Sequence, residues 1–208
     1  VQDLIRMGES YGESGQVPAF KLPPGKKNKD VCAFLSFSSG TTGLPKAVMI
    51  SHQNVIAQCL QVQQITPDTL KKVMAVLPLF HITGLVHQMH LPVLLNAEVV
   101  MLPQFSMEKM LDAIVEYKLT ELLLVPPIII RLVRDPLVDK YDLSHVQRFS
   151  SGAAPLSEEI IQQLQKKFPH TGFKQGYGMT ESCSCITAHP PERYSYKYAH
   201  SGGAIVAL

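Results

Sequence analysis

Residues suited to phosphate chemistry are concentrated between Ser38 and Lys46, where four hydroxyl side chains, two glycines and one lysine occur within nine positions. The glycines allow backbone N–H groups to turn toward an anion, the hydroxyls donate hydrogen bonds, and Lys46 adds a mobile positive charge. A Walker A loop needs its second glycine directly before the lysine, whereas Leu44 and Pro45 intervene here. The composition indicates a phosphate-binding loop, with an ordinary hairpin loop rich in Ser and Gly as the alternative.

The histidines and cysteines are candidate metal ligands, but their spacing gives little support for a metal site. His87 and His90 stand at i and i+3 of an expected helix, and no third ligand stands out. The four cysteines lack the C-x2-C pair of a zinc site, since Cys183 and Cys185 are separated by one residue. Free thiols in a reducing compartment fit this pattern, and we expect an intracellular protein, cytoplasmic or peroxisomal.

The composition is that of a folded globular protein. Of the 208 residues, 46% are hydrophobic and 17% are charged, which excludes intrinsic disorder, a collagen helix and a coiled coil. The net charge of +2 is too small to indicate a nucleic-acid partner. The most apolar stretch, Leu122–Val133, contains two prolines and is too short for a membrane span.

Three segments differ in composition. Residues 1–29 are polar and rich in Gly and Pro, and we interpret them as a connector from a preceding, absent segment. Residues 30–185 hold the chemical motifs and form the expected α/β core, and residues 186–208 are the expected start of a truncated following segment. The chain begins without Met and ends in an apolar run, so we expect a piece of a longer protein.

Short strand-like segments, the first of them an apolar run, alternate with helical patterns throughout this core. Strands are predicted at 31–37, 47–50, 73–77, 98–102, 120–125, 146–150 and 172–176. Helices are predicted at 52–65, 81–96, 107–118, from 126 onward and at 157–168, with Ser51 and Ser106 as N-caps and Pro126 as a helix start. The alternation predicts an α/β fold with a mostly parallel sheet flanked by helices, and with ligands at the carboxyl ends of the strands.

Four segments together resemble the adenylate-forming, or AMP-binding, enzymes: acyl- and aryl-CoA synthetases, luciferases and nonribosomal-peptide adenylation domains. Ser39–Lys46 (SGTTGLPK) resembles the signature loop of this superfamily. Leu77–Gly84 (LPLFHITG) is similar to its fourth core motif, and Gln175–Glu181 (QGYGMTE) to its fifth. Ser150–Leu156 (SSGAAPL) resembles its adenine loop, and Ala47 departs from the usual glycine. The implied fold is part of the superfamily's large N-terminal domain.

The resemblance implies a reaction in two halves. A carboxylate attacks the α-phosphate of ATP, which gives an acyl-adenylate and pyrophosphate, and coenzyme A then takes the acyl group. The first half needs no general base, because a carboxylic acid is already ionised at pH 7. The implied ligands are ATP, Mg²⁺, coenzyme A as a co-substrate, and a small carboxylic acid.

The resemblance also implies roles for individual residues. Four residues carry the catalytic roles, and the last of them would hold Mg²⁺: Lys46, His81, Thr180 and Glu181. A larger set would bind the nucleotide: Ser38, Ser39, Gly40, Thr41, Thr42, Gly43, Lys46, Gly152, Ala153, Ala154, Tyr177, Gly178 and Thr180. A third set would line the acyl pocket: His81, Thr83, Gly84, His87, Ala154 and Gly176.

Two positions favour one branch of the superfamily. His81 stands where the amino-acid-activating branch has an Asp, and Met179 stands where that branch has a Pro. Both favour an acid without an α-amine, and the segments are most similar to 4-coumarate–CoA ligases and their luciferase-like relatives. Aryl and medium-chain aliphatic acids both remain open as substrates.

The superfamily's ribose-binding Asp, its hinge and its C-terminal catalytic Lys are not recognisable after the fifth motif. We therefore expect this chain alone to have little activity, and its open sheet edges to favour self-association. Two alternatives stay open: a non-catalytic module that binds a nucleotide or an acyl group, and a luciferase-like adenylating oxygenase.

Overall fold

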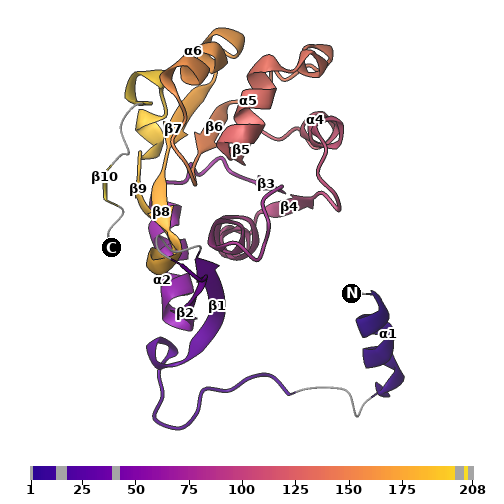
Figure 1. Ribbon diagram of the computed structural model, residues 1–208, viewed down its shortest axis with the longest axis vertical. Helices are drawn as coiled ribbons and strands as arrows, with labels where there is room; N and C mark the ends of the chain where they lie inside the picture. The colour runs from indigo at the N-terminus through magenta and orange to yellow at the C-terminus, as the bar shows by residue number, and fades with distance from the viewer. Residues whose placement is uncertain (1, 13–17, 39–42, 200–203, 206–208) are drawn as a thin grey trace.

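Parallel strands connected by helices form the centre of the computed structural model, which describes residues 2–12, 18–38, 43–199 and 204–205 (Figure 1). Strand β3 (Lys72–Ala75) pairs in parallel with β4 (Glu98–Met101). Strands β5 (Glu121–Leu124), β6 (Arg148–Ser151) and β7 (Gly172–Gln175) form a second parallel sheet in this order. The prediction of an α/β fold with parallel sheets and flanking helices is confirmed.

Helices α4 (Met107–Glu116), α5 (Pro126–Arg134) and α6 (Glu158–Lys167) cover one face of these strands (Figure 1). Two of these helices begin as the sequence predicted, α4 after a serine N-cap and α5 at a proline. The Ser106 side chain accepts a hydrogen bond from the backbone N–H of Lys109 over 3.1 Å, and Pro126 is the first residue of α5. Helix α2 (His52–Gln64) begins in the same way, because Ser51 accepts from the N–H of Asn54 over 3.1 Å.

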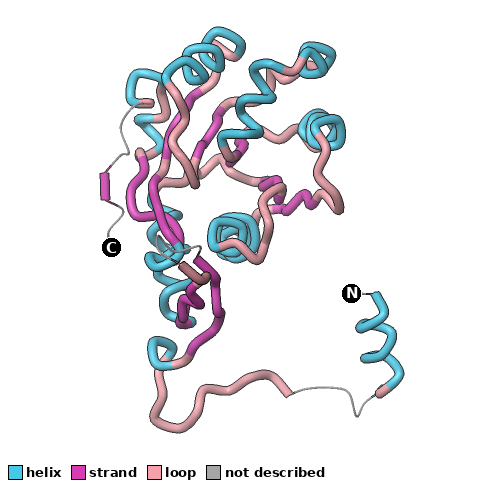
Figure 2. The backbone as a smooth tube through the Cα atoms, in the orientation of Figure 1, coloured by secondary structure: helices cyan, strands magenta, loops and turns pink. Residues whose placement is uncertain are grey.

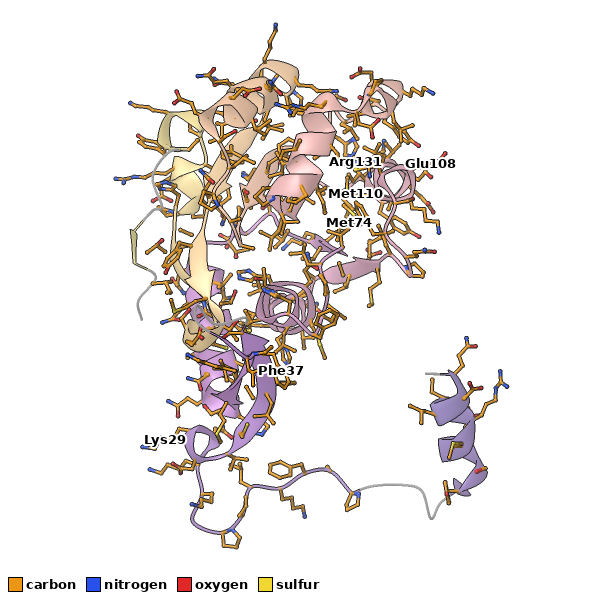
Figure 3. The ribbon with its side chains drawn as sticks, viewed as in Figure 1. Lys29, Phe37, Met74, Glu108, Met110 and Arg131 are labelled. Atoms are coloured by element: carbon orange, nitrogen blue, oxygen red, sulfur yellow. The ribbon has the colours of Figure 1, made fainter. Side chains whose placement is uncertain are left out.

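Successive side chains of β5, β6 and β7 point to opposite faces of the second sheet, so that one face packs in the hydrophobic core and the other faces a pocket. Leu122, Leu124, Phe149 and Phe173 are at most 1% exposed and pack with α4, α5 and α6 in the main hydrophobic core. Met74 of β3 and Met110 of α4 belong to the same core and point into it (Figure 3). The alternate positions face the opposite way, toward a pocket described below.

A smaller core lies around α2. It contains buried residues of α2 and of the helical segment that follows Thr83, together with Ile50 of β2 and Cys183. All four cysteines, Cys183 included, are free thiols. The pocket lies between this cluster and the sheet, because residues of both line it.

Antiparallel strands supplement the parallel sheets and were only partly predicted. The hairpin of β1 (Cys32–Ser38) and β2 (Lys46–Ser51) matches two expected strands. Strands β8 (Tyr177–Met179), β9 (Ser184–Ala188) and β10 (Ala204–Ile205) form a further antiparallel sheet, of which the sequence analysis missed β8 and β9, while β10 falls in the apolar run read as a strand at the end of the chain. Two of these strands have three residues or fewer, too short for a pattern of alternation to emerge.

The expected helix at 81–96 is irregular. Gly84–His90 forms a π-helix, and α3 continues over Leu91–Leu95. The backbone N–H of Leu91 donates to Val86 O, five residues earlier, which is the π-helical spacing. Pro92 has no N–H and cannot restore the regular α-helical hydrogen bond in the next turn.

The N-terminal segment contains helix α1 (Gln2–Ser10), which has no buried residue and stands apart from the sheets (Figure 1). The sequence analysis treated it as part of a connector, because its pattern is polar. Short 3-10 helices occupy Asn28–Asp30, Pro136–Lys140, Thr180–Ser182, Pro191–Arg193 and Tyr196–Tyr198, among longer loops (Figure 2). None of the helices in the described residues is long and apolar enough to cross a membrane.

Candidate active site

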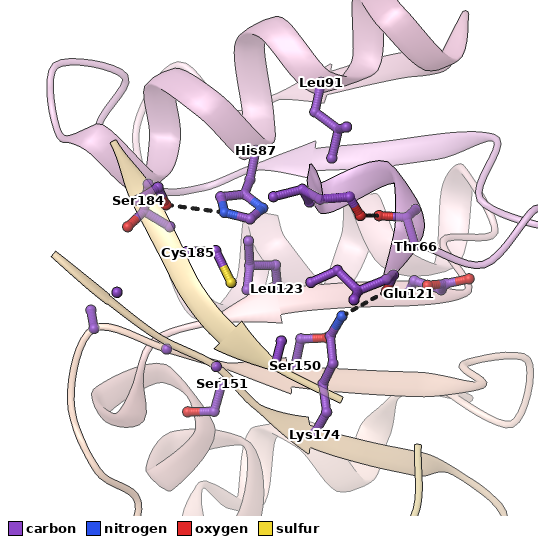
Figure 4. A pocket seen from close by; sticks show the side chains of 18 of the residues that line it. Thr66, His87, Leu91, Glu121, Leu123, Ser150, Ser151, Lys174, Ser184 and Cys185 are labelled. Atoms are coloured by element: carbon purple, nitrogen blue, oxygen red, sulfur yellow. Dashed lines mark hydrogen bonds between the residues drawn. The ribbon is translucent and has the colours of Figure 1, made fainter. Parts of the chain in front are cut away.

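A pocket of about 220 Å³ lies between the β5–β6–β7 sheet, the end of α2 and the π-helix (Figure 4). Its lining comes from segments far apart in the sequence. Nine residues assigned to the site from the sequence line it: His81, Thr83, His87, Gly152, Ala153, Gly176, Tyr177, Gly178 and Thr180. The folded chain therefore brings the fourth motif, the adenine loop and the fifth motif to one cavity.

His81 lies in an exposed turn at the start of the helical region. Its Nδ1 accepts a hydrogen bond from the backbone N–H of Thr83 over 3.2 Å. A nitrogen that accepts carries no proton, so the neutral ring holds its proton on Nε2. His81 is thereby prepared to donate a hydrogen bond from Nε2.

His87 projects from the π-helix into the pocket, where its Nε2 lies 3.1 Å from Ser184 Oγ (Figure 4). Burial, followed by the nearby charge of Lys174, lowers the pKa of His87 to about 4. The ring is therefore neutral at pH 7.

His90, the other member of the possible metal pair, has a different environment. Its Nδ1 lies 2.7 Å from Leu85 O and must donate to that carbonyl. Within the described parts of the chain, no group of three His, Cys, Asp or Glu residues is placed to hold a metal ion.

Two small-residue loops lie at the carboxyl ends of β6 and β7. Gly152 and Ala153 follow β6, and Ala153 has a left-handed backbone with φ of 71°, an uncommon conformation for a residue with a side chain. Gly176 follows β7 and also lines the pocket. Ala154, predicted at the pocket floor, is exposed and lies outside the lining.

Two of the predicted glycines are required by close packing. A Cβ on Gly178 would lie 1.8 Å from Ser184 O of the neighbouring strand, and a Cβ on Gly84 would lie 2.2 Å from Pro78 O. Gly84 is buried in its turn and does not line the pocket, which differs from its predicted role. Tyr177, next to Gly178, is 54% exposed and lines the pocket.

The predicted phosphate-binding loop meets the fifth motif through a direct hydrogen bond. Ser38 Oγ donates to Glu181 Oε1 over 2.8 Å. Lys46 lies opposite Ser38 in the β1–β2 hairpin, so both ends of the loop are next to each other. Hydrogen bonds from its own backbone N–H and from Ser38, with the charge of Lys46, hold the pKa of Glu181 below its usual range.

The remainder of that loop is only partly described. Gly43 has φ of 153°, a conformation that L side chains rarely adopt. The predicted phosphate-binding residues Ser39, Gly40, Thr41 and Thr42 lie outside the described residues.

Charged residues on the sheet face of the pocket were missed from the sequence. Lys174 of β7 and Glu121 of β5 both line the pocket, and Glu121 forms an ion pair of 3.0 Å with Arg148 of β6. Burial raises the pKa of Glu121, and Arg148 and Lys174 oppose this effect. One signal was available, because a lysine within a short strand of a covered sheet is unusual.

The sequence matches the AMP-binding enzyme family over residues 3–207. A probable 4-coumarate–CoA ligase of Dictyostelium discoideum is 42% identical over 168 residues, which are 79% of this chain and 30% of that protein. The chain thus spans about 30% of the length of such curated relatives.

Comparison with solved structures also finds CoA ligases. A long-chain-fatty-acid–CoA ligase from Archaeoglobus fulgidus superposes with a TM-score of 0.74 at 30% identity, over 86% of this chain and 37% of that one. The o-succinylbenzoate–CoA synthetase of Bacillus subtilis, in complex with ATP and magnesium ion, superposes with a TM-score of 0.71 at 27% identity. That match covers 85% of this chain and 36% of the synthetase.

Proposed function

This chain belongs to the AMP-binding enzyme family, and from this membership we propose that its parent protein is an acid–thiol ligase. The parent uses ATP to convert an aryl or medium-chain carboxylic acid to an acyl-adenylate, and then transfers the acyl group to coenzyme A. The described chain supplies the acid pocket and much of the nucleotide site.

One observation carries this proposal: residues of three separate motifs line one pocket. The phosphate-binding loop is hydrogen-bonded to Glu181, the neighbour of the lining residue Thr180. His81 and Thr83 come from the fourth motif, Gly152 and Ala153 from the loop after β6, and Thr180 from the fifth motif. The hydrogen bond of 2.8 Å between Ser38 and Glu181 links the phosphate-binding loop to this arrangement. Adenylation needs such a geometry, because a carboxylate and a triphosphate must meet in line.

The chemistry of the first half-reaction is mainly the positioning of anions. The acid is already a carboxylate at pH 7, so the site needs donors and cations more than a base. His81 offers an Nε2–H donor for the carboxylate, and Thr180 offers a hydroxyl for the α-phosphate. Lys46 adds positive charge for the β- and γ-phosphates.

Glu181 suits a magnesium ion bound together with the phosphates. Its own backbone N–H, the Ser38 hydroxyl and the charge of Lys46 keep the pKa of its carboxyl low, and Mg²⁺ takes carboxylate and phosphate oxygens. A bound Mg²⁺ supplies positive charge that reduces the repulsion between two anions. The role of Glu181 in this proposal is to orient that charge from the rim of the pocket.

The names of the relatives support both acid classes. The curated relatives are 4-coumarate–CoA ligases, which supports an aryl acid, and one structural relative is a fatty-acid–CoA ligase, which supports an aliphatic acid. The apolar lining from the end of α2, with Val62, Ile65 and Leu70, is compatible with either tail.

Carboxylate-dependent exchange of labelled pyrophosphate into ATP tests the proposal on the full-length parent protein. We expect exchange with at least one member of a panel of cinnamic, benzoic and medium-chain aliphatic acids, and acyl-CoA formation when coenzyme A is added. His81→Ala should weaken acid-dependent exchange, and His170→Ala, an exposed histidine outside the pocket, should not. ATP binding without exchange for any acid would favour a non-catalytic binding module instead.

A further inference from the structure

The pocket contains a charged cluster that acid adenylation does not use. Lys174 of β7 and Glu121 of β5 line the pocket, and Arg148 of the intervening strand β6 is the ion-pair partner of Glu121. Adenylation places its own charges near Lys46 and Glu181, which are not among the residues that line the cavity. The sheet-face cluster therefore needs a separate explanation.

The Lys174 ammonium group is only partly satisfied by the protein. Its Nζ donates to Ile65 O over 3.1 Å and to the Tyr194 hydroxyl, and it lies 4.2 Å from the centre of the Tyr194 ring. An ammonium group has three N–H donors, and the third has no partner among the described residues. The side chain reaches into the cavity, on the side opposite His87 (Figure 4).

The charges around Lys174 leave one positive charge in excess. Glu121 and Arg148 compensate each other through their ion pair of 3.0 Å. His87 is neutral at pH 7, since its pKa is lowered to about 4, and burial raises the pKa of the Cys185 thiol. Burial lowers the pKa of Lys174 to about 8, so most of its population is protonated at pH 7. A buried cation without a matching anion is unfavourable unless a ligand supplies the acceptor.

The strand register places Lys174 deeper in the pocket than the strand ends. Leu123, Ser150 and Lys174 are register partners and form one row across the sheet. Gly152 and Gly176 come two positions later along the chain, just past the ends of β6 and β7 and about 7 Å further on. A molecule that holds its reacting carboxylate near His81 and Thr180 therefore meets Lys174 with its far end.

We propose that Lys174 selects carboxylic acids whose far end carries an oxygen acceptor, such as a phenol oxygen, a ketone or a second carboxylate. This inference rests on the proposed function, because it concerns the acid pocket of the same reaction. Lys174 acts here as a specificity-determining residue: its free N–H and its positive charge are met by the distal oxygen of the substrate. An acid with an apolar far end leaves the same group buried and unpaired.

A purely structural role for Lys174 makes a different prediction. If the lysine only joined β7 to the end of α2 and to Tyr194, its replacement would weaken all acids alike. Selection of a distal oxygen instead changes the ratio between matched acids. The ratio of kcat/KM values is therefore the decisive measurement.

The experiment uses the full-length protein and pairs of acids that differ only at the far end. Suitable pairs are 4-hydroxycinnamate with cinnamate, and adipate with hexanoate. In the unaltered protein we expect the acid with the distal oxygen to be preferred in at least one pair, by roughly ten- to hundred-fold in kcat/KM. Lys174→Met should reduce that ratio to about one, while Lys174→Arg should retain part of it.

Controls keep this proposal separate from the proposed function. Lys166→Met replaces an exposed lysine of α6 and should leave the ratio unchanged. A preference for the apolar member of both pairs in the unaltered protein overturns the inference without any variant. An unchanged ratio in a folded Lys174→Met protein also overturns it, while pyrophosphate exchange with the apolar acids would still support the ligase. Absence of exchange with every acid would instead refute the proposed function itself.

Discussion

His81 and His87 enter the same pocket six positions apart, yet their surroundings give them different chemistry. The Thr83 backbone N–H fixes the tautomer of exposed His81 and leaves its Nε2–H free to donate. His87 is turned inward by the π-helix, contacts Ser184 and stays neutral. His81 is therefore suited to meet a carboxylate, whereas His87 is suited to form the wall of an acyl pocket.

The depressed pKa of His87 predicts acid sensitivity of the fold. Its folded-state pKa of about 4 lies below its ordinary value of 6.5, so the unfolded chain binds more protons between these pH values. The free energy of unfolding must therefore decrease as the pH falls through this window. At pH 5 the loss from this group is about 2 kcal/mol.

Urea unfolding of the 208-residue chain at pH 7 and pH 5 measures this effect. His87→Gln should make the difference between the two pH values smaller by about 2 kcal/mol. His170→Gln, at an exposed position, serves as the control and should leave the difference unchanged. Equal acid sensitivity in the original chain and in His87→Gln would contradict the prediction.

Lys46 is predicted to act on ATP and not on the fold. It is exposed, and its charge contributes to the environment of Glu181. Removal of one charge-assisted contact, about 1.5–3 kcal/mol, should lower kcat/KM for ATP ten- to hundred-fold in Lys46→Met of the full-length protein. Lys166→Met is the matched control. Steady-state kinetics at varied ATP concentration test this, and an unaltered value would argue against a phosphate contact.

The local elements differ in how far the sequence predicted them. Helices α2 and α4 were foreseen because a serine hydroxyl caps each first turn, and α5 because two prolines suit its first turn. Strand β5 was foreseen as a short apolar run, and β6 and β7 as the next strands in the alternation of strands and helices. These features depend on neighbours in sequence, which is why the sequence alone was sufficient.

Other features depend on tertiary contacts and were not foreseen. The π-helix at Gly84–His90 and the β8–β9 pairing depend on backbone contacts, such as the close approach of Gly178 to Ser184 O. Such contacts leave no periodic pattern in the sequence. Among the site residues, the motifs predicted nine of the pocket's lining residues, whereas Lys174 and Glu121 were missed. Their roles follow from strand register, which pairs residues far apart in the sequence.

The close packing of β8 against β9 predicts that alanine substitution lowers stability at one glycine of the site and leaves it nearly unchanged at another. In Gly178→Ala the new Cβ would lie 1.8 Å from Ser184 O, so the backbone of the strand pair must shift, with an expected loss of at least ~2 kcal/mol in unfolding free energy. In Gly152→Ala the nearest atom, Gly176 O, would lie 3.8 Å away, an ordinary contact. Urea unfolding of both variants measures the contrast, and similar stabilities would show that β8 and β9 are not packed this closely.

At the scale of the whole molecule, the β1–β2 hairpin exposes an apolar stripe. Leu35, Phe37 and Met49 are 59%, 68% and 71% exposed, and the register of the hairpin places them on one face. The side chain of Phe37 points away from the two cores (Figure 3). A net charge of +2 provides little repulsion between copies. The described surface thus combines apolar exposure with weak electrostatic protection.

This surface predicts self-association of the isolated 208-residue chain. Sedimentation velocity over a concentration series should show oligomers, and the double variant Phe37→Ser, Met49→Ser should shift the population toward monomers. Val93→Ser removes an apolar side chain that is 81% exposed on α3, outside the stripe, and serves as the control. A chain that stays monomeric at every concentration would contradict the prediction.

The two-sided β5–β6–β7 sheet has a consequence for how this protein could acquire new substrates. Leu122, Phe149 and Phe173 hold the main core, while their neighbours Leu123, Ser150 and Lys174 face the cavity. Under the proposed function, substrate preference and folding stability are encoded at interleaved positions of the same short strands. Substitutions on the cavity side can diversify the accepted acid one position at a time, while the adjacent core residues preserve the scaffold. Such an arrangement gives directed evolution a small set of three positions to randomise, with a low risk of losing the fold.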